Sequence, residues 1–257
     1  MFRFTKIYID VFRFLSINLK HGVVPMRFKM ILASSVAKKI YMSIAGLVWV
    51  LFVTVHLLGN LQLLNSNPDP FNKYSYFLTE QTGEIIYVLE FLLVFFLVTH
   101  FVYAIWVQIG NWRARPQGYS MVRWAHHTSK RSIGSVTMIY TGLLILVFIV
   151  IHLINFKYGT VYTYTPYGFT HPIRNLYKTV IEFFQNPWNV AFYVVIMVLL
   201  GFHLSHAIWS SFQSLGLGSK NFTPFWYAVG VIWAIVIAFG FVFIPLWIYF
   251  THTGGAL

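Results

Sequence analysis

The chain has 257 residues, of which 58% are hydrophobic, 20% aromatic and only 9% charged, and its mean hydropathy is +0.68. A soluble domain of this length cannot bury so much apolar surface, so the composition excludes a soluble globular protein and predicts an integral membrane protein. The chain contains no cysteine, which excludes thioether-attached haem, thiolate-held iron–sulfur clusters and thiolate zinc sites.

Five apolar segments are long enough to cross a bilayer as helices of roughly 20 residues or more. In chain order they cover about residues 38–64, 84–111, 132–156, 189–213 and 225–251. Residues 1–29 alternate aromatic and basic side chains and lack the apolar core of a signal peptide, so we expect residues 1–37 to form a basic interfacial segment on the inner face. The tyrosine-rich loop between the third and fourth segments is expected to cap the outer face, with a short helix over residues 176–184. The sequence thus predicts an all-α integral membrane protein whose five-helix domain spans residues 38–257.

The net charge of +12 indicates orientation in a membrane and not nucleic-acid binding, because the basic residues lie between the apolar segments and at the N-terminus. Of the 18 Lys and Arg residues, 14 belong to the N-terminal part up to Lys39, to the second loop and to the last loop, and four lie on the opposite side. We therefore expect a multi-pass protein of the bacterial inner membrane with its N-terminus inside and its C-terminus outside.

Five of the ten histidines fall inside the apolar segments: His56, His100, His152, His203 and His206. A polar ring in hydrocarbon is costly unless it has a partner, so an intramembrane histidine indicates a functional site. One such histidine alone is explained equally well by an interhelical hydrogen bond. Here four apolar segments each supply a histidine, and these segments contain almost no charged residue that could pair with it. This pattern favours a four-helix haem-binding bundle instead.

The depths of these histidines predict two pairs. His56 and His152 lie 17 and 21 residues outward of the inner basic boundary, or roughly 25 to 30 Å. His100 and His203 lie 13 and about 11 residues from the inner end, or roughly 15 to 20 Å. Two bis-histidine haem planes about 10 Å apart in depth form a path for electrons across the membrane. His206 lies three residues from His203 on nearly the same face, so spacing alone leaves it open as the ligand.

Four glycines near the histidines provide helix surfaces without side chains: Gly46, Gly59, Gly142 and Gly201. A flat macrocycle needs such gaps. Close packing of helices explains small residues in membrane segments equally well.

Four stretches resemble the cytochrome b membrane subunit of succinate dehydrogenase and fumarate reductase, in its single-chain, five-helix, two-haem form. They are SSVAKKIYMSIAGLVWVLFVTVHLLGNL, YVLEFLLVFFLVTHFVYAIW, TMIYTGLLILVFIVIHL and NPWNVAFYVVIMVLLGFHLSHAIWSSFQSLG. The fourth is the most specific, because its Pro-Trp entry, histidine pair and Trp-Ser exit occur together. The resemblance covers about residues 31–250, and residues 1–29 depart from it.

The resemblance implies two haem b groups, one between His56 and His152 and one between His100 and His203, with His203 preferred over His206 as the axial ligand. It implies a quinone-reactive electron-transfer subunit of respiratory complex II, in the tricarboxylic acid cycle. The partners would be a flavoprotein subunit with covalent FAD and an iron–sulfur subunit, both on the inner face, and menaquinone is the expected quinone. Residues at the inner end that we expect to reach haem propionates are Ser43, Arg123, His126, His127, Lys130 and Arg131.

Glu90 is the candidate for proton transfer with quinone. It lies ten residues outward of His100, roughly 15 Å nearer the outer face and so at the level of the outer haem. Quinol oxidation releases two protons with two electrons, so we expect a carboxylate there to accept a proton. The alternative is that Glu90 only reaches the headgroups or favours the positive end of its helix.

Two other functions remain open. One is a dihaem cytochrome b of another quinone-linked oxidoreductase, although the quinol–cytochrome c reductase type takes its ligands from two helices with two widely spaced histidines each, which no segment here has. The other is a haem-free membrane anchor or transporter whose histidines bind substrate or protons.

Overall fold

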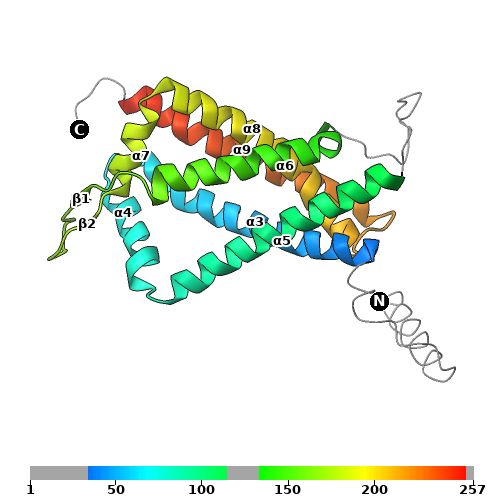
Figure 1. The fold of residues 1–257 in the computed structure, drawn as a ribbon. Helices are drawn as coiled ribbons and strands as arrows, with labels where there is room; N and C mark the ends of the chain where they lie inside the picture. The colour runs from blue at the N-terminus through cyan, green and yellow to red at the C-terminus, as the bar shows by residue number, and fades with distance from the viewer. Residues whose placement is uncertain (1–33, 115–132, 253–257) are drawn as a thin grey trace. The chain divides into compact units, whose positions relative to one another are not determined.

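We describe the fold from a computed structural model, which covers residues 34–114 and 133–252. Within these residues five helices are long and apolar enough to cross a membrane, which confirms the expected all-α, multi-pass architecture. They are α3 (Ser35–Asn60), α5 (Ile85–Ala114), α6 (Ile133–His152), α8 (Pro187–Ser214) and α9 (Phe222–His252) (Figure 1). The chain divides into two units, residues 1–37 and 38–257, and all of the contacts below lie within the second.

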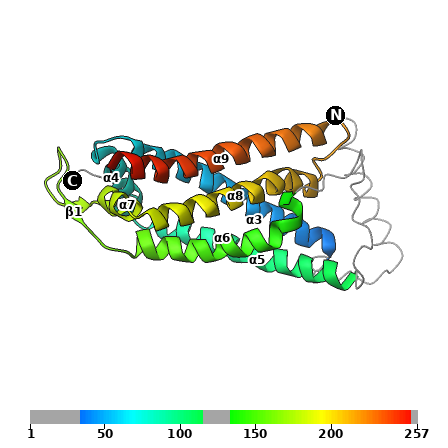
Figure 2. The same ribbon diagram turned by 90° about the horizontal axis from the view of Figure 1, so that it is seen from above.

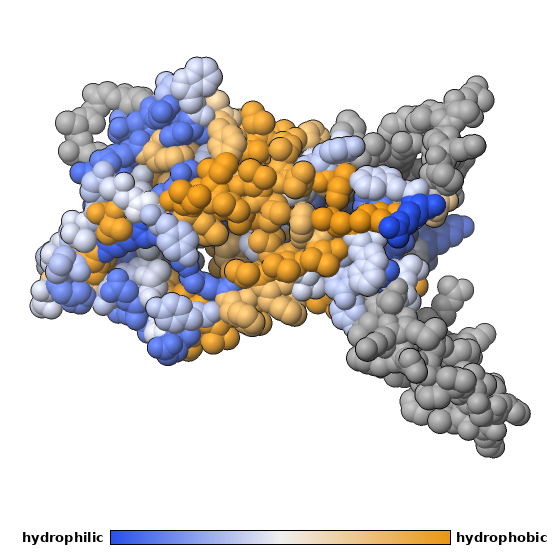
Figure 3. Space-filling view, in the orientation of Figure 1, coloured by the Kyte–Doolittle hydropathy of each residue, from blue (hydrophilic) through white to orange (hydrophobic). Residues whose placement is uncertain are grey.

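The surface of the spanning helices is apolar, as a lipid environment requires. Hydrophobic residues cover the middle of the helices on the face shown in Figure 3, and hydrophilic residues gather at both ends. Leu51 and Phe239 are each 67% exposed although both lie near the middle of their helices, and Phe91, in the first third of α5, is 68% exposed. Exposed apolar side chains at these depths are stable in contact with hydrocarbon, so the surface fits five membrane spans.

Local sequence signals set the ends of α8 and its return into α9. The side chain of Asn186 accepts a hydrogen bond from the backbone N–H of Trp188 (2.9 Å), and Pro187 occupies the first helical position. At the other end, Gly216 adopts a left-handed conformation with φ 82°, which glycine adopts without strain. The connection to α9 is short, so the two helices are antiparallel neighbours.

The helices pack unevenly. The backbone of α8 is in close contact with α9 and α6, and the three lie side by side in Figure 2. A Cβ atom at Gly201 would lie 2.9 Å from the Cβ atom of Ala238, so glycine allows this close approach. In contrast, α3 has no comparable run of close backbone contacts with another described spanning helix, and α5 has no buried residue. The side chains of α3 and α5 must therefore bridge wider separations.

The segments that join the spanning helices at one end form what we call the cap (Figure 1). A 3-10 turn (Leu61–Leu64), α4 (Asp69–Tyr76) and a π-helical turn (Phe77–Gln81) link α3 to α5. A second π-helical turn (Leu153–Lys157), the antiparallel strands β1 (Thr163–Tyr164) and β2 (Ile173–Arg174), and α7 (Leu176–Phe184) link α6 to α8. The bounds of α7 confirm the short helix expected there. A Cβ atom at Gly59 would lie 2.6 Å from the ring of Tyr74, so this glycine lets α4 approach α3.

Buried polar groups hold the cap together. Asn72 is fully buried, and its side chain donates to Asn175 (2.9 Å) and accepts from the backbone N–H of Tyr177 (2.8 Å). Asn175 in turn caps α7 by accepting from the N–H of Lys178 (3.0 Å). Two asparagines thus tie α4 to α7.

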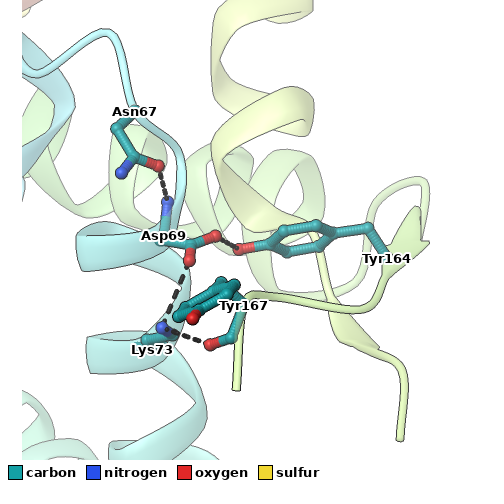
Figure 4. Close-up of polar contacts among 5 residues, drawn as sticks. All are labelled: Asn67, Asp69, Lys73, Tyr164 and Tyr167. Atoms are coloured by element: carbon teal, nitrogen blue, oxygen red, sulfur yellow. Dashed lines mark hydrogen bonds and ion pairs between the residues drawn. The ribbon is translucent and has the colours of Figure 1, made fainter. Parts of the chain in front are cut away.

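A second cluster surrounds Asp69 (Figure 4). Its carboxylate accepts a hydrogen bond from the hydroxyl of Tyr164 (2.9 Å) and pairs with Lys73 (3.2 Å), which also donates to the carbonyl oxygen of Tyr167 (3.0 Å). Burial raises the pKa of the Asp69 carboxyl, but the hydrogen bonds from Tyr164 and Lys73 outweigh it, so that this pKa lies below its usual value. Burial also raises the pKa of Tyr164 to about 12, so its phenol remains a hydrogen-bond donor at neutral pH. The cluster fastens the β1–β2 loop to α4.

Candidate functional site

Two of the intramembrane histidines meet between α3 and α6. The ring centres of His56 and His152 lie 5.8 Å apart, with the ring planes at 87° to each other. His56 also stacks on Phe52 and lies 5.8 Å from the ring of Phe241 on α9. The hydroxyl of Tyr193 lies 3.4 Å from Nδ1 of His152. These residues form what we call the outer pair, the pair nearer the cap, and its aromatic surroundings.

Two further histidines meet between α5 and α8. The ring centres of His100 and His203 lie 6.3 Å apart, with the ring planes at 66° to each other. In the described part of the chain, the histidine ring that contacts His100 belongs to His203 and not to His206. The ring of His206 instead packs edge-on against Trp209, with the centres 5.2 Å apart. His100 and His203 form the inner pair.

Hydrogen bonds fix the rings of the inner pair. Nδ1 of His100 lies 2.9 Å from the backbone carbonyl oxygen of Met42, which can only accept, so Nδ1 carries the proton. Nδ1 of His203 lies 3.2 Å from the hydroxyl of Thr141, which donates to the carbonyl oxygen of Thr137 and therefore accepts from the ring. In both residues this leaves Nε2 with a free lone pair, the arrangement that orients a histidine for metal binding.

Two of the four expected glycines lie against the inner pair. A Cβ atom at Gly46 would lie 3.1 Å from Cε1 and Nδ1 of the His100 ring, and one at Gly142 would lie 3.4 Å from Cε1 of His203. Each glycine therefore gives the facing histidine room beside its helix. The other two expected glycines lie at the packing contacts described above.

The two pairs lie at different levels along the bundle. Gly46 marks the inner pair on α3, and His56 follows ten residues later. Gly142 marks the same level on α6, and His152 also follows ten residues later. Ten residues of helix span about 15 Å, somewhat more than the depth difference of about 10 Å expected from the sequence. Because α3 and α6 give the same separation of ten residues, one histidine pair lies above the other along the bundle.

The expected propionate contacts are only partly covered by the structure. Ser43 is buried and lies on α3, one turn inward of Gly46, at the inner side of the inner pair. The other five expected residues lie outside the described residues: Arg123, His126, His127, Lys130 and Arg131.

Glu90 on α5 forms an ion pair with Lys157, the last residue of the π-helical turn that follows His152. Both side chains are 38% exposed. A Cβ atom at Gly159 would collide with the carbonyl oxygen of Asn155, so the chain needs glycine where it leaves this turn. The pair joins α5 to the turn that follows α6 and provides a structural reason for an acid at this position of α5.

The residues of the two pairs fit a haem better than a bare metal ion. No group of three or more metal-binding side chains occurs within residues 34–114 and 133–252, and two imidazoles alone are too few for a metal site. A porphyrin would supply the remaining ligands if one were bound between the two rings. Imidazole nitrogens lie about 2 Å from a bound metal, so two rings on opposite sides of one ion have centres about 6 Å apart, as in both pairs. The wider separation of α3 and α5 from their neighbours also suits a flat group.

No family model, no curated protein and no solved structure matches the chain. The structure by itself defines a class, an all-α multi-pass membrane protein with five candidate spans. Within that class, this chain carries two stacked histidine pairs across four helices.

Several contacts of the site left no signal in the sequence. The hydrogen bonds to Met42 and Thr141 involve a backbone carbonyl oxygen and a hydroxyl of otherwise apolar helices. Lys157 is one of the four basic residues on the expected outer side, and no sequence pattern pairs it with Glu90. The rotation of each helix about its axis decides these contacts, and hydrophobic patterns define that rotation poorly when a helix is apolar on all sides.

Proposed function

We propose that this chain is a dihaem membrane cytochrome b that carries electrons across the bilayer. The observation that supports it is the pair of stacked bis-histidine arrangements, His56 with His152 and His100 with His203. A haem held by two imidazoles supplies a one-electron carrier without an open coordination position.

The residues of the chain have separate tasks in this proposal. The histidines supply the axial nitrogens, and the groups at Nδ1 orient the inner rings. The aromatic side chains around the outer pair exclude water from it.

We further propose that the chain is the membrane subunit of a succinate:quinone oxidoreductase, with its N-terminus inside. The resemblance of the four histidine-bearing stretches supports this assignment, as does the basic inner side. An iron–sulfur subunit and a flavoprotein with covalent FAD would then dock on the inner face. Quinone would react at the outer level, beside the Glu90–Lys157 ion pair.

The deciding experiment is a reduced-minus-oxidised spectrum of the purified chain, with haem quantified per chain. We expect a low-spin b-type α-band and close to two haems. His171→Ala, in the loop between β1 and β2, and His252→Ala, at the end of α9, change histidines outside the pairs and are matched controls that should retain both haems. A haem-free preparation would contradict the proposal and favour an anchor or transporter.

A second measurement separates the types of dihaem cytochrome. In membranes of the native host, succinate should reduce the haems of the assembled complex, and a competitive inhibitor of succinate oxidation should block this reduction. Haems that are reduced by quinol but not by succinate would indicate a different quinone-linked oxidoreductase.

A further inference from the structure

Four buried side-chain nitrogens in the described part of the chain have no hydrogen-bond partner: Trp49 Nε1, His206 Nδ1, Trp209 Nε1 and Arg174 Nε. Arg174 belongs to the cap, where its other two nitrogens donate to the carbonyl oxygens of Phe156 and Lys157. The other three lie on α3 and α8, two of the helices that carry the histidine pairs. A buried donor without an acceptor is costly, and a bound group that completes it is one explanation.

Two of these nitrogens lie together on α8, just inward of the inner pair. His206 lies three residues after His203, and Trp209 lies six residues after it. Measured along the helix axis from His203, they are about 4.5 and 9 Å away. The two rings are in edge-on contact, and Trp209 is only 7% exposed. The buried Ser43 hydroxyl on α3 lies on the same inner side, one turn from Gly46. Three polar groups therefore lie inward of the inner pair, on two helices.

Residues 34–114 and 133–252 offer these donors no acidic acceptor. All five acidic residues in the described part lie in the cap or in the outer half of α5: Asp69, Glu80, Glu84, Glu90 and Glu182. No acidic side chain of the described residues lies beside His206 and Trp209, so an anionic group of a bound molecule is one explanation for their unpartnered nitrogens.

We propose that His206 and Trp209 bind a propionate of the inner haem through Nδ1–H and Nε1–H. This inference rests on the proposed function. Propionates are the only anionic groups of haem b, and a carboxylate accepts two such hydrogen bonds, which are stronger than those between neutral groups. His206 is then a haem-binding residue with a role distinct from axial ligation.

Loss of these hydrogen-bond donors should lower the midpoint potential of the inner haem. Donors at a propionate offset part of its negative charge. Without them, more negative charge remains near the iron, which stabilises the ferric form and lowers the midpoint potential of that haem. Trp209→Phe removes one donor and keeps an aromatic ring. His206→Leu removes the other, whereas His206→Asn retains an N–H group near the position of Nδ1.

The experiment compares the midpoint potentials of both haems in the purified complex. We expect Trp209→Phe and His206→Leu to lower the potential of one haem only, the same one, and to shift its propionate bending band in the resonance Raman spectrum. His206→Asn should restore most of the parent potential. Trp188→Phe, at the exposed outer end of the same helix, is the matched control and should leave both potentials unchanged. If His206→Leu loses a haem outright, Trp209→Phe and His206→Asn carry the test.

Two outcomes would overturn the inference while leaving the dihaem proposal intact. One is that both haems bind and none of the three variants changes a potential or a propionate band. The other is that His206→Leu abolishes the low-spin signal of one haem while His203→Ala retains it, which would make His206 the axial ligand. A parent protein without haem would instead overturn the proposed function itself.

Discussion

The four paired histidines are the residues whose replacement should have the most specific effect. His56→Ala and His152→Ala should each remove the outer haem and spare the inner one, because each removes one of two axial nitrogens. His100→Ala and His203→Ala should each remove the inner haem. Spectra and redox titrations of the purified variants measure this. Depletion of the same spectral component by His56→Ala and His100→Ala would refute the pairing.

Gly46 provides a steric test of the inner pair. A Cβ atom there would lie 3.1 Å from the His100 ring, closer than most packed atoms tolerate. Gly46→Val should therefore displace the ring and reduce binding of the inner haem, with the outer haem retained. Gly110→Ala on α5 is the control, because a Cβ atom at Gly110 has no neighbour within 4 Å. Equal haem contents in parent and Gly46→Val would show that this contact is dispensable.

The ion pair gives the expected role of Glu90 a sharper test. Glu90→Gln should lower succinate:quinone turnover at least tenfold, a barrier increase of about 1.4 kcal/mol, while turnover with a dye that bypasses the membrane subunit stays unchanged. Lys157→Gln separates the two readings of the pair, since it breaks the ion pair but keeps the carboxylate. If the ion pair has only a structural role, Glu90→Gln and Lys157→Gln should lower quinone turnover equally. Quinone turnover within about twofold of the parent, with both haems present, would exclude Glu90 as the proton acceptor.

At the scale of elements, the Asp69 cluster should make attachment of the β1–β2 loop to α4 depend on pH. A carboxyl whose pKa is lowered in the folded state stabilises that state above its ordinary pKa of about 4, and the stabilisation is lost as pH falls further. The pair with Lys73 is partly exposed, so we expect less than about 1 kcal/mol.

Thermal unfolding in detergent at neutral and acid pH measures this effect. Asp69→Asn should lower stability at pH 7 and make little difference once the parent carboxyl is protonated. Glu80→Gln, in the neighbouring π-helical turn, is the control and should behave as the parent does. A constant difference between Asp69→Asn and parent at all pH values would show that charge is not the cause.

At the scale of the whole molecule, the distribution of basic residues predicts the orientation. Reporters fused after Leu257 should be active only on the outer side, and reporters in the loop between α8 and α9 only on the inner side. Replacing the basic residues of the second loop with neutral ones should weaken this preference. A C-terminal reporter active inside would reverse the proposed docking side for the partner subunits.

The sequence by itself determined the class of protein and the five spans, and it predicted that the histidines lie at two levels, with a smaller separation than the helices give. Composition and apolar length decide whether a segment crosses a membrane, and a fixed rise per residue converts residue counts into depth, so these properties need no tertiary contact. The short α7 was also predictable, because its asparagine cap and apolar face are local signals.

Only the tertiary structure decided how the helices are rotated and what each polar group contacts. It brought His203, and not its neighbour His206, to His100, joined Glu90 to Lys157, and left the nitrogens of His206 and Trp209 without acceptors. Apolar helices in lipid have no polar face to fix their rotation, so packing against neighbours determines it. The buried asparagines of the cap likewise join residues about a hundred positions apart, which no local pattern records.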